Sequence, residues 1–184
     1  MSRFAVIDTE TNWVDRVMSI GTVIADSETF EPVAAKYHIL PDECAIGGMY
    51  ESTLYVESPV EPVQCSREEA LSDLVAWFAE YEVDAVFAYN ASFDRNHLPE
   101  LSGMNWHDIM RFAAYRQYNH KIPATAECFS TGRLKRGYGV EPMLRLLSGR
   151  KSYSETHNAL HDAFDELEIM HLLGYRVTEY PPLR

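Results

Sequence analysis

This chain of 184 residues contains few cysteines and no long apolar run, which argues against several classes of protein. Its only cysteines, Cys44, Cys65 and Cys128, are far apart and form no C-x-x-C pair, so neither a disulfide framework nor a cysteine-based zinc site has support. No apolar run approaches the roughly 18 residues of a membrane span, and the N-terminus lacks a signal-peptide pattern. We therefore expect a cytoplasmic protein with reduced thiols and no membrane partner.

Basic residues are also scarce, with 16 Lys and Arg against 28 Asp and Glu and a formal net charge of −12. This balance is unusual for a protein that binds nucleic acid, because phosphate groups attract a basic surface. The cations are nevertheless concentrated: residues 133–151 hold six of them against Glu141 alone, a local charge of +5 that leaves −17 on the rest. This segment is either a basic stripe on an acidic body or a solvated loop and helix face.

The length and composition, with 46% hydrophobic and 24% charged residues, indicate a single globular domain that spans residues 1–184. Apolar runs at 3–9, 17–26 and 33–40 predict three strands in a meander. The stretch 41–65 has scattered proline and glycine and no sustained period, so it predicts an irregular connection at the edge of a substrate groove.

Helices are expected in the second part of the chain. Ser66 and Glu69 form a capping-box pattern for a helix that ends near Tyr81. Its predicted buried stripe consists of Leu71, Leu74, Val75, Phe78 and Ala79. A buried strand at 84–89 and a short helix from Ser92 to Leu98 follow, and further helices are expected at about 107–118, 141–148 and 158–173. The order of elements predicts an α/β fold in which one mixed central sheet, with three antiparallel strands first, is flanked by helices.

Three groups of residues carry candidate chemistry. Asp8 and Glu10 stand at the end of the first strand, where side chains at i and i+2 point to the same face and can converge on one cation. Asp94 falls in the first turn of a helix, where an acid also has a purely structural explanation in the helix dipole. We expect Phe93 to pack inward and thereby fix the direction of Asp94.

The third group surrounds the start of the last helix. Ala159 and Ala163 share a face with Leu167 and Met170 and would let this helix approach the sheet closely. Asp162 flanks that stripe, which is an unfavourable place for a charge unless a cation lies there. His157 falls just before the helix, beside the same opening.

A set of four carboxylates and one histidine suits the hydrolysis of a phosphodiester. Two divalent ions about 3.5 to 4 Å apart can stabilise the attacking and the leaving oxygen. Hard oxygen ligands select Mg²⁺ or Mn²⁺ over zinc. A neutral histidine can take the proton of the attacking water, because its unperturbed pKa near 6.5 suits neutral pH. His157 is the candidate for this base, and His161, turned by about 100° around the helix, is expected to point away.

Taken together, the residues resemble the DnaQ-like superfamily, specifically its DEDDh branch of 3′→5′ exonucleases with a ribonuclease-H-like fold. Three motifs appear in family order: Val6-Ile7-Asp8-Thr9-Glu10-Thr11, then Asn90-Ala91-Ser92-Phe93-Asp94, then His157-x-Ala159-x-x-Asp162. The second motif, continued by Arg95, is most similar to that of bacterial exodeoxyribonuclease X. The resemblance covers residues 4 to about 173.

The resemblance implies a specific set of roles. It implies that Asp8, Glu10, Asp94 and Asp162 hold two Mg²⁺ ions, for which Mn²⁺ can substitute, and that His157 is the general base. The implied partner is a nucleic acid with a free 3′ end, single-stranded DNA in preference to RNA, from which nucleoside 5′-monophosphates are released. Thr11, Trp13, Asn90 and Phe93 are the expected substrate-binding residues.

Two departures and two alternatives accompany this interpretation. Asn12 and Trp13 stand where the family often has a small residue and glycine, so Trp13 either stacks on a base or caps the core. Tyr89 replaces a histidine that is common before the asparagine of the second motif. An exoribonuclease of the same superfamily, similar to oligoribonuclease or ribonuclease T, is the main alternative. A nucleic-acid-binding module without catalysis is the other, although no ligand or histidine is missing.

Three further acids are expected to have structural or solvated roles. Asp108 resembles a family position that caps the following helix, and capping is the preferred interpretation. Asp165 and Glu166 are predicted to be solvated acids on the last helix.

Overall fold

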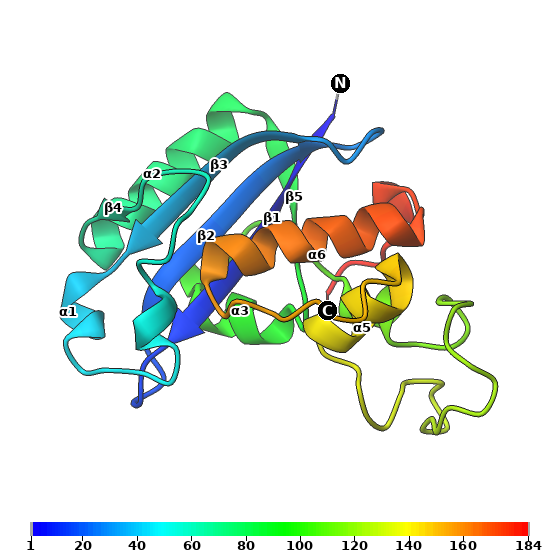
Figure 1. Ribbon diagram of the computed structural model, residues 1–184. Helices are drawn as coiled ribbons and strands as arrows, with labels where there is room; N and C mark the ends of the chain where they lie inside the picture. Colours follow the sequence, from blue (N-terminus) through cyan, green and yellow to red (C-terminus); the bar gives the residue numbers. More distant parts are fainter. Residues whose placement is uncertain (1, 184) are drawn as a thin grey trace.

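The computed structural model describes residues 2–183 around a six-stranded mixed sheet (Figure 1). Three strands form an antiparallel meander: β1 (Arg3–Thr11), β2 (Val17–Asp26) and β3 (Pro32–Ile39). The other three run parallel to their neighbours: β4 (Val63–Gln64) beside β3, β5 (Val83–Ala88) beside β1, and β6 (Asn105–Asp108) beside β5. The strand order is β4-β3-β2-β1-β5-β6, which confirms the predicted mixed sheet with three antiparallel strands first.

The helices lie on both faces of this sheet. The α-helices are α1 (Pro41–Cys44), α2 (Arg67–Glu80), α3 (Ser92–His97), α4 (Met110–Ala113), α5 (Val140–Ser148) and α6 (Ala159–Leu173). Three short 3-10 helices are η1 (Glu51–Thr53), η2 (Pro99–Leu101) and η3 (Val177–Glu179). In Figure 1, α6 crosses one face of the sheet and α2 lies behind the other. Between residues 2 and 183, no helix combines the length and apolar character needed to cross a membrane.

Strand β1 supplies side chains to both cores. Phe4 and Val6 pack with α5 and α6, whereas Ala5 and Ile7 pack with α2 on the opposite face. Burial on both faces explains why this strand is a continuous apolar run. Since side chains alternate along a strand, Asp8 and the other even-numbered residues of β1 point to the face that α6 covers.

The first turn of α6 lies directly on strand β2. A Cβ atom placed on Gly21 would lie 2.1 Å from the carbonyl carbon of Ala159, so only glycine fits there. Ala159 and Ala163 are fully buried, which agrees with the predicted close approach. Gly21 is paired with Asp8 across the sheet, and the contact therefore places the start of α6 beside the end of β1.

Helix α2 begins as the sequence predicts, but its buried stripe differs. The Ser66 side chain accepts from the Glu69 N–H, and the Glu69 carboxylate accepts from the Ser66 N–H. Leu71, Leu74 and Phe78 are buried as expected, together with Trp77. Val75, which is 52% exposed, and Ala79 were wrongly included in the stripe. The reason is that α2 rests on a single face of the sheet, which leaves Val75 and Ala79 exposed on its outer flank.

The predicted helix at 107–118 is wrong over most of its length. His107 and Asp108 pair with Phe87 and Ala88 as part of β6, and α4 is only four residues long. Ladder pairing with a buried parallel strand overrides the local helical pattern here. Residues 114–139 then form an irregular segment, called the arm below, that extends from the right of the molecule in Figure 1.

Candidate active site

A cavity of about 470 Å³ opens at the end of β1. The lining comes from β1, the turn after it, the loop before η1, α3, the irregular segment before α6 and the first turn of α6. The lining residues are Asp8, Thr9, Glu10, Thr11, Asn12, Trp13, Asp15, Met49, Tyr50, Phe93, Glu155, His157 and Asp162. Asp8 and Glu10 point into it from β1. The predicted role of the stretch 41–65 at the edge of this site is consistent with the positions of Met49 and Tyr50.

Asp94 lies behind the lining, in the first turn of α3, and is 2% exposed. The Thr9 hydroxyl donates a hydrogen bond of 2.8 Å to Asp94 Oδ1, which ties the aspartate to β1 between the two carboxylates of that strand. Two acids from other elements, Glu166 of α6 and Asp108 of β6, hold the turn before α3. The Tyr89 N–H donates to Glu166 Oε2 and the Asn90 N–H to Asp108 Oδ1, at 3.0 Å each.

Asn158 fixes the start of α6 and thereby the direction of Asp162. Its side-chain oxygen accepts from the N–H groups of Leu160 and His161, which caps the helix. Its amide nitrogen donates to the Tyr37 hydroxyl and the Thr53 carbonyl, at 2.9 Å each. Asn158 is fully buried, and Asp162, one helical turn later, is 4% exposed.

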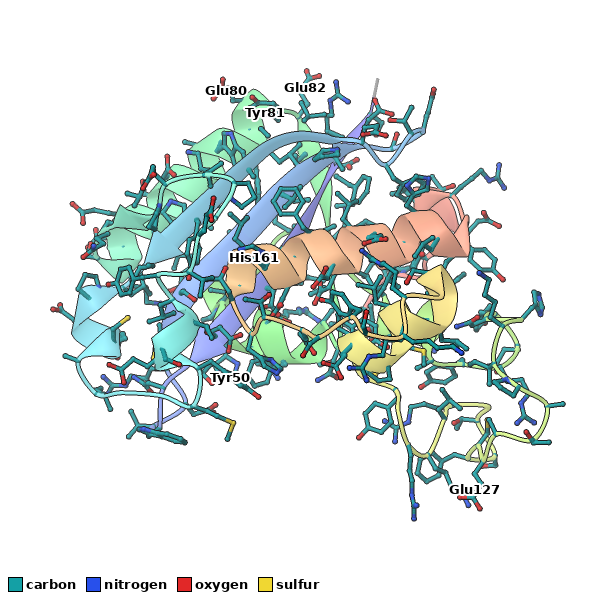
Figure 2. The ribbon with its side chains drawn as sticks, in the orientation of Figure 1. Tyr50, Glu80, Tyr81, Glu82, Glu127 and His161 are labelled. Carbon is teal, nitrogen blue, oxygen red and sulfur yellow. The ribbon has the colours of Figure 1, made fainter. Side chains whose placement is uncertain are left out.

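His157 precedes this cap in a conformation that non-glycine residues rarely adopt, with φ of 55°. The Thr53 hydroxyl donates to the His157 carbonyl, and the imidazole stacks on Tyr50 with ring centroids 4.1 Å apart. One ligand atom from each of Glu10, His157 and Asp162 lies within 4.8 Å of the others. In Figure 2, Tyr50 lies below the first turn of α6, whereas His161 lies at that turn.

Burial raises the pKa of Asp8, Glu10, Asp94 and Asp162, and repulsion from neighbouring acids adds to this effect at Asp8, Glu10 and Asp162. Burial, with the neighbouring Glu155 next in size, raises the pKa of Asp162 to about 9. The same two causes raise the pKa of Glu10 to about 7. Burial raises the pKa of Asp94 to about 7, against the opposing hydrogen bond from Thr9. Burial followed by repulsion from Glu166 raises the pKa of Asp8 well above its usual value.

The carboxylates around this cavity are better explained as ligands of a divalent cation than as a cluster of acids without a ligand. Asp162 Oδ1 is buried and has no hydrogen-bond partner among the described residues. A buried carboxylate oxygen without a partner is costly, and a cation removes both that cost and the repulsion between the acids. Asp8, Glu10 and Asp162 offer hard oxygen atoms to the same space, with Asp94 held against Thr9, so these residues are able to hold Mg²⁺ or Mn²⁺.

The predicted substrate-binding residues do not all lie in the cavity. Thr11 and Trp13 line it, and Trp13 is 64% exposed, so the alternative in which it caps the core is wrong. Phe93 also lines the cavity, but it is 39% exposed and packs on His97, which corrects the expectation that it packs inward. Asn90 lies outside the lining, in a left-handed turn with φ of 64°.

Two acids of the site were not predicted as such. Glu155 lines the cavity from the irregular segment before α6, where no periodic pattern marks it. Glu166 was predicted to be solvated, but it is 1% exposed and accepts from the Tyr89 N–H. Its spacing of four from Asp162 is the sequence signal that places both on one helix face. Asp165 is likewise only partly exposed and accepts from the Tyr153 hydroxyl, so the prediction of a solvated acid is wrong for both.

Two other predicted roles can be compared with the structure. His161 hydrogen-bonds the Glu57 carbonyl at 2.8 Å and does not line the cavity, as expected. Asp108 accepts from the Met110 N–H at the start of α4, which agrees with capping, and it also accepts from Asn90. Its second contact shows that it orders the turn before α3 as well.

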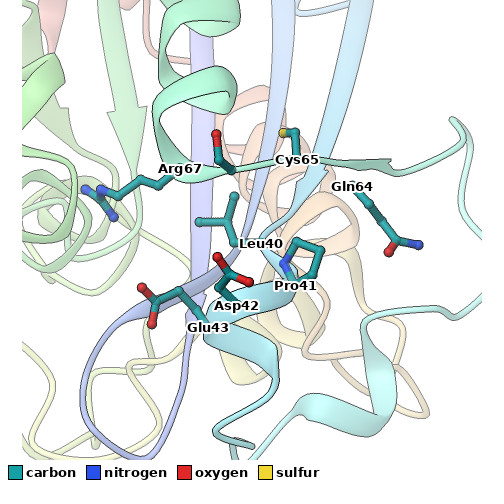
Figure 3. Close-up of a pocket in the computed structure, with 8 residues that line it drawn as sticks. Leu40, Pro41, Asp42, Glu43, Gln64, Cys65 and Arg67 are labelled. Carbon is teal, nitrogen blue, oxygen red and sulfur yellow. The ribbon is translucent and has the colours of Figure 1, made fainter.

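A second cavity, of about 350 Å³, lies between α1 and the start of α2 (Figure 3). It shares no lining residue with the first cavity. Its cation, Arg67, is already held by Glu100 through two hydrogen bonds, and its acids Asp42 and Glu43 are neighbours on one short helix. The convergence of acids from distant segments is therefore a property of the first cavity.

Comparison with known proteins identifies the fold. No family model matches the sequence, and no curated protein sequence matches it. The nuclease domain of 3′hExo, a DEDDh family member bound to rAMP, has a TM-score of 0.67 and 14% identity over 100% of this chain and 96% of that domain. A structure of 3′-end specific recognition of a histone mRNA stem-loop by 3′-exonuclease also has a TM-score of 0.67 and 14% identity, over 100% of this chain and 91% of that one.

A bacterial enzyme has a similar arrangement in part of its length. Exonuclease I of E. coli, in complex with a dT13 oligonucleotide carrying a 5cy group, has a TM-score of 0.61 and 13% identity over 94% of this chain. The match covers 40% of the exonuclease I chain. These similarities confirm the ribonuclease-H-like fold that the resemblance of the motifs implied.

Proposed function

We propose that this protein is a metal-dependent 3′→5′ exonuclease of the DEDDh kind and that residues 1–184 form its single catalytic domain. One observation carries the proposal. Segments far apart in the sequence bring Asp8, Glu10, His157 and Asp162 to one opening, and the Thr9 hydroxyl holds Asp94 of α3 behind its lining. A purely structural role for these acids does not account for burying several like charges together at a cost to each of them.

The proposed ligands are Asp8, Glu10, Asp94 and Asp162, and the proposed ions are two Mg²⁺, with Mn²⁺ as a substitute. Bound there, the ions would supply charge stabilisation to the attacking and leaving oxygens of a phosphodiester. The remaining work belongs to the chain. His157 takes the proton of the attacking water at its imidazole, Tyr50 holds that ring by stacking, and Thr9 keeps Asp94 directed at β1.

The proposed substrate is the 3′ end of a single strand, with a nucleoside 5′-monophosphate as the product. Trp13 and Phe93 present exposed aromatic rings to the cavity, on which the terminal base would stack. The similarity of Asn90–Arg95 to bacterial exodeoxyribonuclease X favours DNA over RNA. An RNA substrate remains the second candidate, since one of the similar structures is bound to rAMP and another recognises an mRNA stem-loop.

The proposal is tested with single-stranded DNA and RNA of one sequence, labelled either at the 5′ or at the 3′ end, in Mg²⁺, Mn²⁺ or EDTA. We expect the 3′ label to leave as a mononucleotide and the 5′-labelled strand to shorten stepwise. Asp8→Ala and His157→Ala should abolish or strongly reduce both signals. Asp15→Ala is the matched control, because Asp15 is an exposed acid of the same cavity whose hydrogen-bond partner is His97.

Three results would count against the proposal: cleavage that persists in EDTA, full activity of both variants, or loss of activity in Asp15→Ala to the same degree. Faster degradation of RNA than of DNA would replace the proposed substrate and leave the mechanism intact.

A further inference from the structure

The arm, residues 114–139, carries a charge opposite to that of the rest of the chain. It contains five basic residues and one acid, Glu127, for a net charge of +4. The remaining residues therefore carry −16. The basic run predicted at 133–151 is divided by the fold. Its first part belongs to the arm, whereas Arg145 pairs with Glu141 and Arg150 pairs with Glu168.

The arm has a defined structure, although it contains no regular helix or sheet. Its two ends are joined by backbone hydrogen bonds, from the Leu134 N–H to Ala114 and from the Arg116 N–H to Gly132. Ile122 and Leu134 are 5% and 6% exposed and belong to the core that α5 and α6 form. These contacts order the backbone from which the basic side chains extend.

Three of these cations are available to a ligand. Arg133 lies between two exposed aromatic rings, with its guanidinium carbon 5.0 Å from the Phe129 centroid and 4.9 Å from that of Tyr138. Stacking of this kind orients a guanidinium while its N–H groups, at the rim, stay free to donate. Lys135 and Arg136 are exposed. None of the three forms an ion pair with any acid between residues 2 and 183.

The arm is connected to the proposed active site at its C-terminal end. The Tyr89 hydroxyl donates a hydrogen bond to the Tyr138 carbonyl. Tyr89 immediately precedes the turn that leads to α3 and Asp94. A nucleic-acid strand that leaves the cavity along this turn would therefore reach Tyr138 first and the stacked Arg133 next.

We propose that the arm binds the single-stranded nucleic acid upstream of the 3′ nucleotide that is cleaved. This inference rests on the proposed function, because it assigns a second contact to the same substrate. Unpaired cations interleaved with exposed aromatic rings match a single strand, whose phosphates and unstacked bases are both accessible. An acidic peptide would satisfy the cations but would leave the Phe129 and Tyr138 rings without planar partners.

Binding is measured with a labelled oligothymidylate of about 16 nucleotides, a length within the range of single-strand sites. EDTA prevents cleavage in this assay. We expect the double variant Lys135→Gln with Arg136→Gln to reduce the slope of log Kd against log salt by about 1.4, at about 0.7 for each phosphate contact that is lost. If the two proteins bind equally at 1 M salt, that slope gives a loss of about 25-fold in affinity at 0.1 M.

Lys36→Gln is the matched control, since it removes one positive charge from the face of the sheet that α2 covers. The side chains of Lys135 and Arg136 are exposed, so the double variant should keep the wild-type melting temperature. The inference is overturned if the double variant binds with wild-type affinity and slope, or if Lys36→Gln has the same effect per charge. It is also overturned if polyglutamate of equal charge competes as well as a second oligothymidylate.

A short substrate separates the arm from the chemistry. The p-nitrophenyl ester of thymidine 5′-monophosphate occupies only the site of the terminal nucleotide. With Mg²⁺, we expect the double variant to hydrolyse this ester at the wild-type rate while its KM for the oligonucleotide rises about tenfold or more. Failure of the wild-type protein to hydrolyse either substrate would refute the proposed function. An equal KM of variant and wild type for the oligonucleotide would refute the role of the arm alone.

Discussion

Replacing Asp162 by asparagine should stabilise the metal-free protein while abolishing its activity. Asp162 is 4% exposed, its Oδ1 has no partner among the described residues, and burial raises its pKa to about 9. Asparagine has the shape of the carboxyl group but cannot acquire its charge. The variant therefore removes an unfavourable interaction that wild-type protein bears whenever no cation is bound.

The magnitude follows from the shift in pKa. One pKa unit corresponds to about 1.4 kcal/mol, and the interval from the ordinary value of 3.8 to pH 7 is about three units, which gives about 4 kcal/mol. This is an upper limit, because protonation of one carboxyl group also relieves its neighbours. A carboxyl whose pKa is raised by folding binds more protons in the folded state. Its contribution to stability is therefore lost progressively as pH rises from about 4 to 9.

The assay is urea unfolding in EDTA at pH 5, 7 and 8.5. The advantage of Asp162→Asn over wild type should grow with pH. Addition of Mg²⁺ should raise the stability of wild type, because a ligand that binds only the folded state stabilises it, and should raise that of the variant much less. Glu168→Gln on the same helix is the control, since that residue is paired with Arg150 at the surface. An Asp162→Asn protein that is less stable than wild type in EDTA at pH 8.5 would refute the reasoning.

Three other substitutions test separate parts of the site. His157→Gln should lower kcat about 10²- to 10⁴-fold while the Mg²⁺-dependent rise in melting temperature remains, and unchanged kcat would exclude it as the base. Trp13→Ala should raise KM for single-stranded DNA by about tenfold, because a stacked base contributes about 1 to 3 kcal/mol. The substitution Val14→Ala, at an exposed neighbour of Trp13, should leave this KM unchanged. Equal effects of the two substitutions on KM would argue against stacking. Asn158→Ala should lower the free energy of unfolding, measured in urea, by about 2 to 3 kcal/mol, since a helix cap and two hydrogen bonds of a buried side chain are lost. A loss below about 1 kcal/mol would contradict this role.

The sequence was sufficient for the antiparallel part of the sheet and for part of the cavity lining, for identifiable reasons. Strand alternation placed Asp8 and Glu10 on one face, and Ala159 and Ala163, on either side of Asp162, indicated a helix that approaches the sheet closely. The structure agrees on both points and adds Gly21, against which Ala159 packs. Residue type and spacing are informative here because few side chains fit at a strand end that faces the start of a helix.

Features that depend on pairing between distant segments could not be predicted. Strand β6 has the sequence Asn-Trp-His-Asp, which is a weak strand pattern, and it forms because β5 offers a free edge. The arm has no hydrophobic period, and its hydrogen bonds join residues far apart within it. Burial of Glu166 depends on the Tyr89 N–H, which no local pattern brings near α6.

The net charge of −12 was the strongest argument against a nucleic-acid partner, and the distribution of charge in the structure weakens it. Formal charge counts each acid as fully ionised, whereas burial raises the pKa of Glu10 and Asp94 to about 7 and that of Asp162 to about 9. Bound cations would neutralise these same groups under the proposed function. The cations at 133–136 have no acid partner among the described residues, so they retain their full charge for phosphate. An acidic total charge and a site for a polyanion are therefore compatible when the acids converge on metal and the cations lie apart from them.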